Sequence, residues 1–324
     1  MKHLKAFYGC ILFCAAIIFI LSSCSKEKYD FMFSELPSGT NLDLEAITFI
    51  NDSTGFVCGG SRYSQGVLIK TNDGGVNWKN VSNQYMEKAL YNFSFINNDT
   101  GFCCGYDGKI FSTDDAGETW NFYQTYAWKP LRSIFMFNSR DGFSVGGNGF
   151  DKGCFLNWNN VEGYWHVDTT NAEYRDVYFF NRNEGLISAY GKILRTNDGG
   201  ETWTITSANQ DFFVSMSFVN DNVGYAVGYT GSILKTTDGG QTWDRLRNAN
   251  SLFRPAAYFN KVIFRDENTG YIIGEKGCFM KTEDGGNHWS QIKNVPEINL
   301  KGIYLVNNGG YVCGEGGKIY RFIE

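Results

Sequence analysis

The sequence has little proline, little histidine and no excess of positive charge. Only 4 prolines occur in 324 residues, which argues against a Pro-rich linker protein. The 29 Lys and Arg residues are outnumbered by 34 Asp and Glu residues and form no basic block, so nucleic acid is not an expected partner. By contrast, 38 glycines and 17% aromatic residues predict short strands joined by tight turns.

Metal and phosphate motifs are missing too. After Cys24 the chain contains no Cys-x-x-Cys pair, so no metal site is expected. A phosphate-binding glycine loop is also absent, and no cofactor is expected. Cys58, Cys104 and Cys313 occupy strand positions where other repeats have aliphatic residues. They are interpreted as small buried thiols rather than disulfides.

The N-terminus has the pattern of a targeting segment. The apolar run over residues 7–21 is 15 residues long, which is short for a membrane-spanning helix. It is followed by Leu21-Ser22-Ser23-Cys24, which resembles the lipobox of bacterial lipoproteins. The resemblance implies a signal peptide over residues 1–23, lipidation of Cys24 and a tether over residues 24–29. The membrane is then a partner through the anchor, and the expected location is the cell envelope at the outer membrane, on either face. An ordinary signal peptide or an N-terminal anchor is the alternative.

Internal repetition is the main signal of the sequence. Thr-x-Asp-x-Gly-x-x-Trp occurs five times, at residues 71–78, 113–120, 196–203, 236–243 and 282–289, and a degraded copy ends at Trp165. Each copy follows a second pattern, an apolar strand and an Asn/Asp-x-x-x-Gly turn, which occurs seven times. Repeats of about 40 residues with four short strands each indicate a β-propeller. The expected fold is an all-β, seven-bladed propeller of four-stranded blades over residues 30–324, with the N-terminal strand (residues 30–36) closing the last blade.

The motif copies identify Asp-box, or BNR-type, repeats, as in sialidases, sortilin-like receptors and some xyloglucanases. The combination of both patterns most resembles the photosystem II assembly-factor propellers. A motif that recurs in every unit is expected to be structural, with Asp accepting backbone N–H bonds and Trp packing between strands. The predicted structural residues are Asp73, Trp78, Asp115, Trp120, Asp198, Trp203, Asp238, Trp243, Asp284 and Trp289.

The predicted binding face is the one opposite the Asp turns, where the innermost strands begin. The aligned first positions of those strands are Glu45, Tyr91, Arg132, Arg175, Val214, Asn260 and Lys301. Mixed Arg and aromatic residues are typical of protein-binding surfaces, and the resemblance implies arginines at inner-strand starts, which Arg132 and Arg175 match. The candidate binding residues are Arg132, Arg175, Lys301, Tyr91, Glu45, Tyr190, Tyr229 and Trp128. A water-filled channel without a ligand is the alternative.

Catalysis is weakly supported by the residue types. His166 and His288 are expected in an outer strand and in an Asp turn, far from a common site. Glu45, Asp176, Glu275 and Glu315 are the carboxylates that a glycosidase would need to pair. No catalytic residue is assigned. The predicted function is a non-catalytic, lipid-anchored propeller that binds protein or scaffolds assembly, and the alternative is a carbohydrate-active protein that binds or hydrolyses a glycan.

Overall fold

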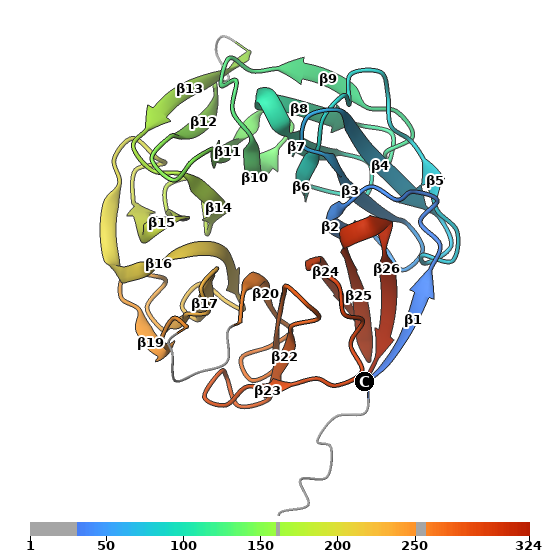
Figure 1. Ribbon diagram of the computed structural model, residues 1–324. Helices are drawn as coiled ribbons and strands as arrows, with labels where there is room; N and C mark the ends of the chain where they lie inside the picture. The colour runs from blue at the N-terminus through green and yellow to red at the C-terminus, as the bar shows by residue number, and fades with distance from the viewer. Residues whose placement is uncertain (1–30, 160–162, 251–256) are drawn as a thin grey trace, which may run out of the picture.

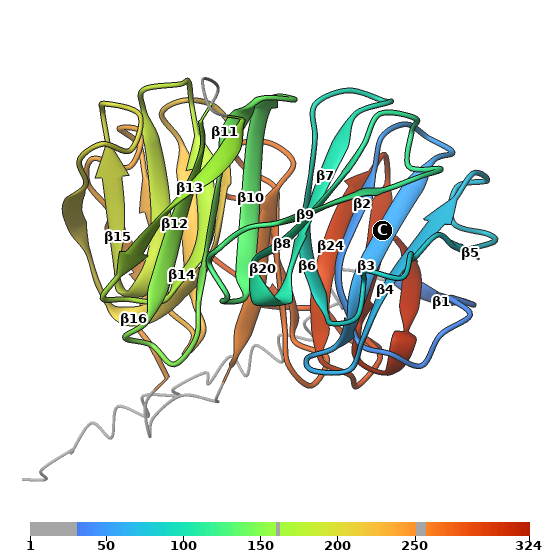
Figure 2. The same cartoon turned by 90° about the horizontal axis from the view of Figure 1, so that it is seen from above.

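A computed structural model describes residues 31–159, 163–250 and 257–324. Short antiparallel sheets stand radially around a common axis (Figure 1). Their strands run between the two ends of the ring (Figure 2). Cys24, the predicted signal peptide and the predicted tether lie outside the described residues.

Four sheets are formed by consecutive strands, numbered from the axis outward. The first contains β2 (Leu44–Phe49), β3 (Gly55–Ser61), β4 (Gln65–Thr71) and β5 (Lys79–Asn80). The second contains β6 (Leu90–Phe95), β7 (Gly101–Gly105), β8 (Lys109–Thr113) and β9 (Asn121–Gln124). The third contains β10 (Leu131–Asn138), β11 (Asp141–Gly147), β12 (Gly153–Asn159) and β13 (Tyr164–Thr170). Another contains β20 (Phe259–Phe264), β21 (Gly270–Gly274), β22 (Phe279–Thr282) and β23 (Ser290–Gln291).

Two sheets depart from this plan. A six-stranded sheet contains β14 (Tyr174–Phe179), β15 (Gly185–Thr196), β16 (Thr204–Phe218), β17 (Gly224–Gly228), β18 (Ile233–Thr236) and β19 (Asp244–Arg247). The last sheet has the order β1-β26-β25-β24, with β24 (Leu300–Val306), β25 (Gly309–Gly314), β26 (Ile319–Ile323) and β1 (Met32–Leu36). Two short 3-10 turns, η1 (Tyr106–Gly108) and η2 (Glu315–Gly317), lie in strand connections.

The expectation of seven four-stranded blades is wrong. The described residues form six hydrogen-bonded sheets, so the propeller counted by its sheets is six-bladed. Strand β16 is the reason, because its first half pairs with β15 and its second half, from Phe213, pairs with β17. Other units have a loop between the outer strand and the next inner strand. Here the chain passes directly from one to the other with a kink at Gln210, whose φ is 69°. The fourth and fifth sequence repeats therefore share one sheet.

The predicted closure by the N-terminal strand is confirmed. Strand β1 pairs antiparallel with β26, from Met32 opposite Ile323 to Leu36 opposite Ile319. Phe31, just before β1, stacks on Phe322 with ring centroids 5.7 Å apart. The two ends of the chain therefore complete one sheet, in which β1 covers the edge of β26 that would otherwise be unpaired (Figure 1).

Neighbouring sheets pack through aromatic rings. Tyr225 stacks on Phe264 of the following sheet at 3.5 Å, and Phe143 stacks on Phe179 at 4.0 Å. The six cysteines in the described residues are free thiols, and all but Cys278 are fully buried. These contacts place the core between the sheets. The helices of the described part of the chain include none with the length and apolar character needed to cross a bilayer.

Candidate functional site

Every inner strand begins with a β-bulge that presents one side chain to the axis. The pairing register of each inner strand slips by one residue at its start. The extra residues are Glu45, Tyr91, Arg132, Arg175, Val214, Asn260 and Lys301. A bulge leaves its extra residue out of the ladder and re-aims its side chain. The seven positions aligned in the sequence are therefore seven equivalent backbone positions.

The bulge also explains why most repeats have a glycine at or near the end of the second strand. A Cβ atom added to Gly146 would lie 1.9 Å from the carbonyl oxygen of Pro130, and one added to Gly59 would lie 2.0 Å from that of Asp43. Gly274 and Gly314 have equivalent close approaches. No side chain fits at these distances, so glycine is required where the bulged backbone approaches.

The bulged residues line one cavity at the end of the central channel where the inner strands begin. We call this cavity the mouth. This cavity of about 290 Å³ is lined by all seven of them and by Lys261, Glu275 and Asn299. Five of the eight predicted binding residues therefore lie together. The other three are not among the residues that line it. Tyr229 donates a hydrogen bond to Glu275 Oε1 at 2.6 Å, and Tyr190 and Trp128 are 50% and 64% exposed.

One side of the mouth is an arginine pair that shares a single carboxylate. Glu173, 4% exposed, lies 3.1 Å from Arg175 Nη1 and 3.7 Å from Arg132 Nε through the same oxygen, Oε1. Its other oxygen accepts the N–H of Phe150 at 3.2 Å. Burial lowers the pKa of Arg175, as does the adjacent Arg132 charge. Two positive charges thus face one negative charge in a partly desolvated site.

Both guanidinium groups also lie over aromatic rings. Arg132 Cζ is 4.4 Å from the centroid of the Tyr91 ring, and Arg175 Cζ is 5.1 Å from that of Phe212. These cation–π contacts hold the side chains in place at the mouth. The buried Nε–H of Arg132 has no hydrogen-bond acceptor within the described part of the chain.

The other side of the mouth is an acidic pair with one lysine. Lys301 Nζ lies 2.7 Å from Glu45 Oε1 and 3.0 Å from Asp43 Oδ2. Burial acts to lower the pKa of Lys301, but Glu45 and Asp43 outweigh it and raise the pKa. Burial acts to raise the pKa of Asp43, and its hydrogen bonds from Gly316 N and from Lys301 lower it overall. The mouth therefore has a cationic and an anionic side.

Glu173 and Asp43 were missed by the sequence analysis. Each stands two residues before a bulged residue, Arg175 and Glu45 respectively. Asn299 stands in the same relation to Lys301 and also lines the mouth. The position two residues before the bulged residue could therefore have indicated these side chains. It lies in the connections between repeats, outside the strand pattern by which the repeats were aligned.

The carboxylates considered for glycoside hydrolysis are engaged in other contacts. Asp176 is 8% exposed and accepts hydrogen bonds from Ser133 Oγ at 2.8 Å and Met216 N at 2.9 Å. Glu45 pairs with Lys301 and Glu275 with Tyr229, whereas Glu315 is exposed at the rim. His288 bonds the Asp turn at Asp284, away from the mouth. Asp176, Glu45 and Glu275 are therefore each bound to a neighbouring group.

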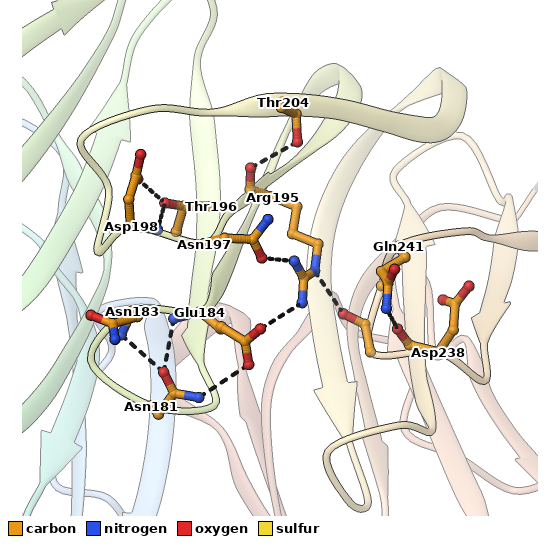
Figure 3. A network of polar contacts seen from close by, with 12 residues as sticks. Asn181, Asn183, Glu184, Arg195, Thr196, Asn197, Asp198, Thr204, Asp238 and Gln241 are labelled. Carbon is orange, nitrogen blue, oxygen red and sulfur yellow. Dashed lines mark hydrogen bonds and ion pairs between the residues drawn. The ribbon is translucent and has the colours of Figure 1, made fainter.

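The Asp turns lie at the opposite end of the ring and brace it. In the turn at residues 196–203, Asp198 Oδ1 accepts the hydroxyl of Thr196 at 2.8 Å and the N–H of Thr202 at 2.9 Å (Figure 3). Gly199 N donates a hydrogen bond to the carbonyl oxygen of Asn183 at 2.8 Å. This bond joins the Asp turn to the turn between the inner two strands. Arg195 connects this turn to Gly239 O of the next one at 3.3 Å. The two kinds of turn share one face.

The same bonds recur at every complete Asp turn. The aspartate accepts a Thr hydroxyl at 2.8–2.9 Å, and the glycine two residues after the aspartate donates its N–H to that Thr oxygen at 2.8–3.0 Å. The aspartates are Asp73, Asp115, Asp198, Asp238 and Asp284. Hydrogen bonds from the turn lower the pKa of Asp115, Asp198 and Asp284 to about 2. The motif tryptophans cross the inner-strand phenylalanines edge-on, as in Trp120 on Phe95 and Trp289 on Phe264. Among the described residues no cluster of His, Cys, Asp or Glu could hold a metal ion.

Comparison with known proteins gives consistent results. The model of a family described as photosynthesis system II assembly factor YCF48 matches residues 23–130, 151–253 and 205–302. The photosystem II assembly lipoprotein Ycf48 of Picosynechococcus sp. is 28% identical over 193 residues, which cover 51% of this chain and 52% of that protein. The chain thus spans about half the length of this curated relative.

Solved structures extend the similarity of fold over most of the chain. YCF48 bound to D1 peptide has a TM-score of 0.69 at 18% identity, covering 91% of this chain and 98% of that one. YCF48 from Cyanidioschyzon merolae has a TM-score of 0.69 at 16% identity, covering 90% and 98%. A GH74 xyloglucanase from Xanthomonas campestris has a TM-score of 0.66 at 10% identity, covering 90% and 53%. At these identities the structures share the fold alone.

Proposed function

The chain belongs to the family of photosynthesis system II assembly factor YCF48, and from that premise we propose that it is a non-catalytic assembly scaffold whose mouth binds a segment of a partner protein. The arginine pair that shares Glu173 carries this proposal. Arg132 and Arg175 together bring one more positive charge than Glu173 neutralises, and both side chains are partly exposed. A carboxylate on the partner would neutralise that charge and accept hydrogen bonds from the exposed part of the guanidinium groups.

Exposed aromatic side chains around the arginine pair suit a protein partner. Tyr126, Trp128, Phe150 and Tyr190 are between 50% and 77% exposed; the first three stand on connections between strands, and Tyr190 lies within β15. Phe150 and Tyr190 lie 4.9 Å apart, and both rings contact Phe212, over which Arg175 lies. Trp, Tyr and Arg are the residues that contribute most to protein–protein affinity. The anionic side, with Asp43 and Glu45, would then set the orientation of a segment that carries a basic group next to its carboxylate.

Peptide binding tests this function directly. The first probe is the D1 peptide, because a related YCF48 binds it, followed by a panel of acidic peptides with free or amidated C-termini. We expect the double variant Arg132→Ala, Arg175→Ala to bind at least about tenfold more weakly by fluorescence anisotropy. Arg140→Ala is the matched control, because Arg140 is exposed at the Asp-turn end. Equal affinities of the double variant and the wild type would contradict the proposal. A glycan-array signal without any peptide binding would favour the carbohydrate-active alternative.

We also propose that the protein is anchored by a lipid on Cys24 in the cell envelope, at the outer membrane. The apolar run before Leu21-Ser22-Ser23-Cys24 supports this proposal, and it fits the family, of which one curated relative is a lipoprotein. Cys24→Ser should shift the protein from the detergent phase to the aqueous phase in a Triton X-114 partition. Detergent-phase recovery of the Cys24→Ser variant would contradict lipidation, and membrane fractionation with surface proteolysis would locate the protein and its exposed face.

A further inference from the structure

Just below the mouth, the inner strands are joined by hydrogen bonds from one strand to the next. Met216 N donates to Asp176 Oδ2 at 2.9 Å, and Val262 N donates to Ser215 Oγ at 3.3 Å. In both cases the acceptor is the residue directly after the bulge, and the donor is the second residue after the bulge in the following inner strand. The N–H groups that face the axis therefore obtain acceptors from side chains at one repeated position.

The next strands in the ring lack that acceptor. The residues after the bulge are Lys261 in β20, Gly302 in β24 and Ala46 in β2. An ammonium group only donates hydrogen bonds, and glycine and alanine have no polar side-chain atom. The N–H groups equivalent to those of Met216 and Val262 belong to Ile303 and Ile47. Within the described chain, no side-chain acceptor like Asp176 or Ser215 meets either of them.

A cavity lies where the acceptors are missing. It has a volume of about 210 Å³ and is lined by Ala46, Ile47, Gly302, Ile303 and Lys261, with Thr48, Asn92, Phe93 and Tyr304 completing its wall. The volume is below the roughly 300–1,000 Å³ of organic-ligand pockets, but it is ample for an ion with its water. Asn92 is the polar neighbour, and its carbonyl oxygen already accepts Phe93 N at 2.9 Å. The remaining functional groups are donors or hydroxyls.

Lys261 gives this cavity its charge. Its side chain is half-buried and lines both the mouth and the cavity below it. No carboxylate of the described residues lies within ion-pair distance of its ammonium group. By contrast, Lys301 in the neighbouring strand has two carboxylates within 3.0 Å. A half-buried cation without a counter-ion, next to backbone N–H groups without acceptors, forms a site of positive potential.

We propose that this cavity binds a small inorganic anion, held by Lys261 Nζ and by the N–H groups of Ile47 and Ile303. The anion takes the place of the acceptor oxygens that Asp176 and Ser215 supply elsewhere in the ring. It would neutralise Lys261 and hydrogen-bond two backbone donors that otherwise depend on water. This site is separate from the arginine pair, and it does not rest on the proposed function.

Diffraction tests the position of the anion. Crystals of the wild-type protein soaked in sodium bromide should show an anomalous peak within hydrogen-bonding distance of Lys261 Nζ and Ile303 N. A parallel phosphate soak distinguishes the ligand, because tetrahedral density there identifies an oxyanion and bromide alone identifies a halide. The absence of both bromide and phosphate from the cavity would overturn the proposal, regardless of how variants of the protein unfold.

Thermal unfolding tests the same site in solution. At constant ionic strength, the wild-type midpoint should rise with bromide or phosphate relative to gluconate, a larger organic anion. Lys261→Ser places at this position the hydroxyl that Ser133 and Ser215 supply in other strands, so it should fold and should weaken the apparent anion affinity at least about tenfold. Lys79→Met is the matched control, because Lys79 is exposed on β5. A wild-type response in Lys261→Ser, or none in the wild type, would overturn the proposal.

Discussion

The two ends of the ring use repetition in opposite ways. At the Asp-turn end the same residues make the same hydrogen bonds in five units, from Asp73 to Asp284. At the mouth the backbone bulge recurs in all seven inner strands. The side chains at the seven bulged positions, from Glu45 to Lys301, differ in their surroundings. Recurring side chains build the turns at one end, whereas different side chains occupy the recurring backbone position at the other end. The proposed binding site therefore lies at the end where the units differ most in sequence.

The largest expected effect comes from breaking the scaffold that both ends share. A chain that begins at Ser38 lacks β1 and Phe31, whose ring is 5% exposed. Losing the burial of that ring together with the hydrogen bonds of a whole strand should cost about 5 kcal/mol or more in the free energy of unfolding. Urea unfolding followed by tryptophan fluorescence measures the loss. An unchanged midpoint would show that closure of the last sheet does not stabilise the ring.

A tryptophan at each end sharpens the comparison. Trp120 in an Asp turn is 6% exposed and packs on Phe56 and Phe95, whereas Trp128 at the mouth is 64% exposed. Trp120→Ala should lower the free energy of unfolding by about 3–5 kcal/mol. Trp128→Ala should change it by less than about 0.5 kcal/mol. Equal losses in the two variants would contradict the division into a structural end and a binding end.

Glu173 is the expected exception at the mouth. Removing it leaves Arg132 and Arg175 close together without their shared carboxylate. Because Arg175 is partly exposed, Glu173→Ala should cost about 2 kcal/mol, less than the loss of a fully buried partner. Glu315→Ala is the control, since Glu315 is an exposed carboxylate of the rim. If both variants were as stable as the wild type, the arginine pair would not need Glu173 for its placement.

The smallest expected effect is a dependence on acid at the Asp-turn end. Hydrogen bonds from the Thr119 side chain and backbone lower the pKa of Asp115 to about 2 from the usual 3.8. The unfolded state therefore binds more protons between these values, so the stabilisation is complete above about pH 4 and is lost as the pH falls towards 2. Asp115→Asn should flatten the slope of unfolding free energy against pH in this range. Asp114→Asn removes a neighbouring carboxylate that the turn does not use, so a slope equally flat in that variant would contradict the assignment.

Much of the mouth could be predicted from the sequence because it inherits the repeat. Aligning the repeats placed Arg132, Arg175 and Lys301 at one position, and the structure places them around one cavity. Glu173 and Asp43 were not predicted, because they lie in connections whose lengths differ between repeats. The loss of acceptors at Gly302 and Ala46 was also invisible, since small apolar residues in a strand give no sign of an unpaired N–H on the neighbouring strand.

The sequence by itself determined the strands and the turns, because these follow from local pattern and from hydrogen bonds within a few residues. It also predicted the closing partner of β26, because the last repeat has only three strands and residues 30–36 supply a fourth. It also determined at which end of each unit the same residues recur. Only the tertiary structure decided how many sheets there are. Whether two units form separate sheets depends on how the chain leaves one outer strand and enters the next inner strand. At Gln210 it continues as β16 without a loop, so two repeats become one sheet through pairings on both edges of a single strand.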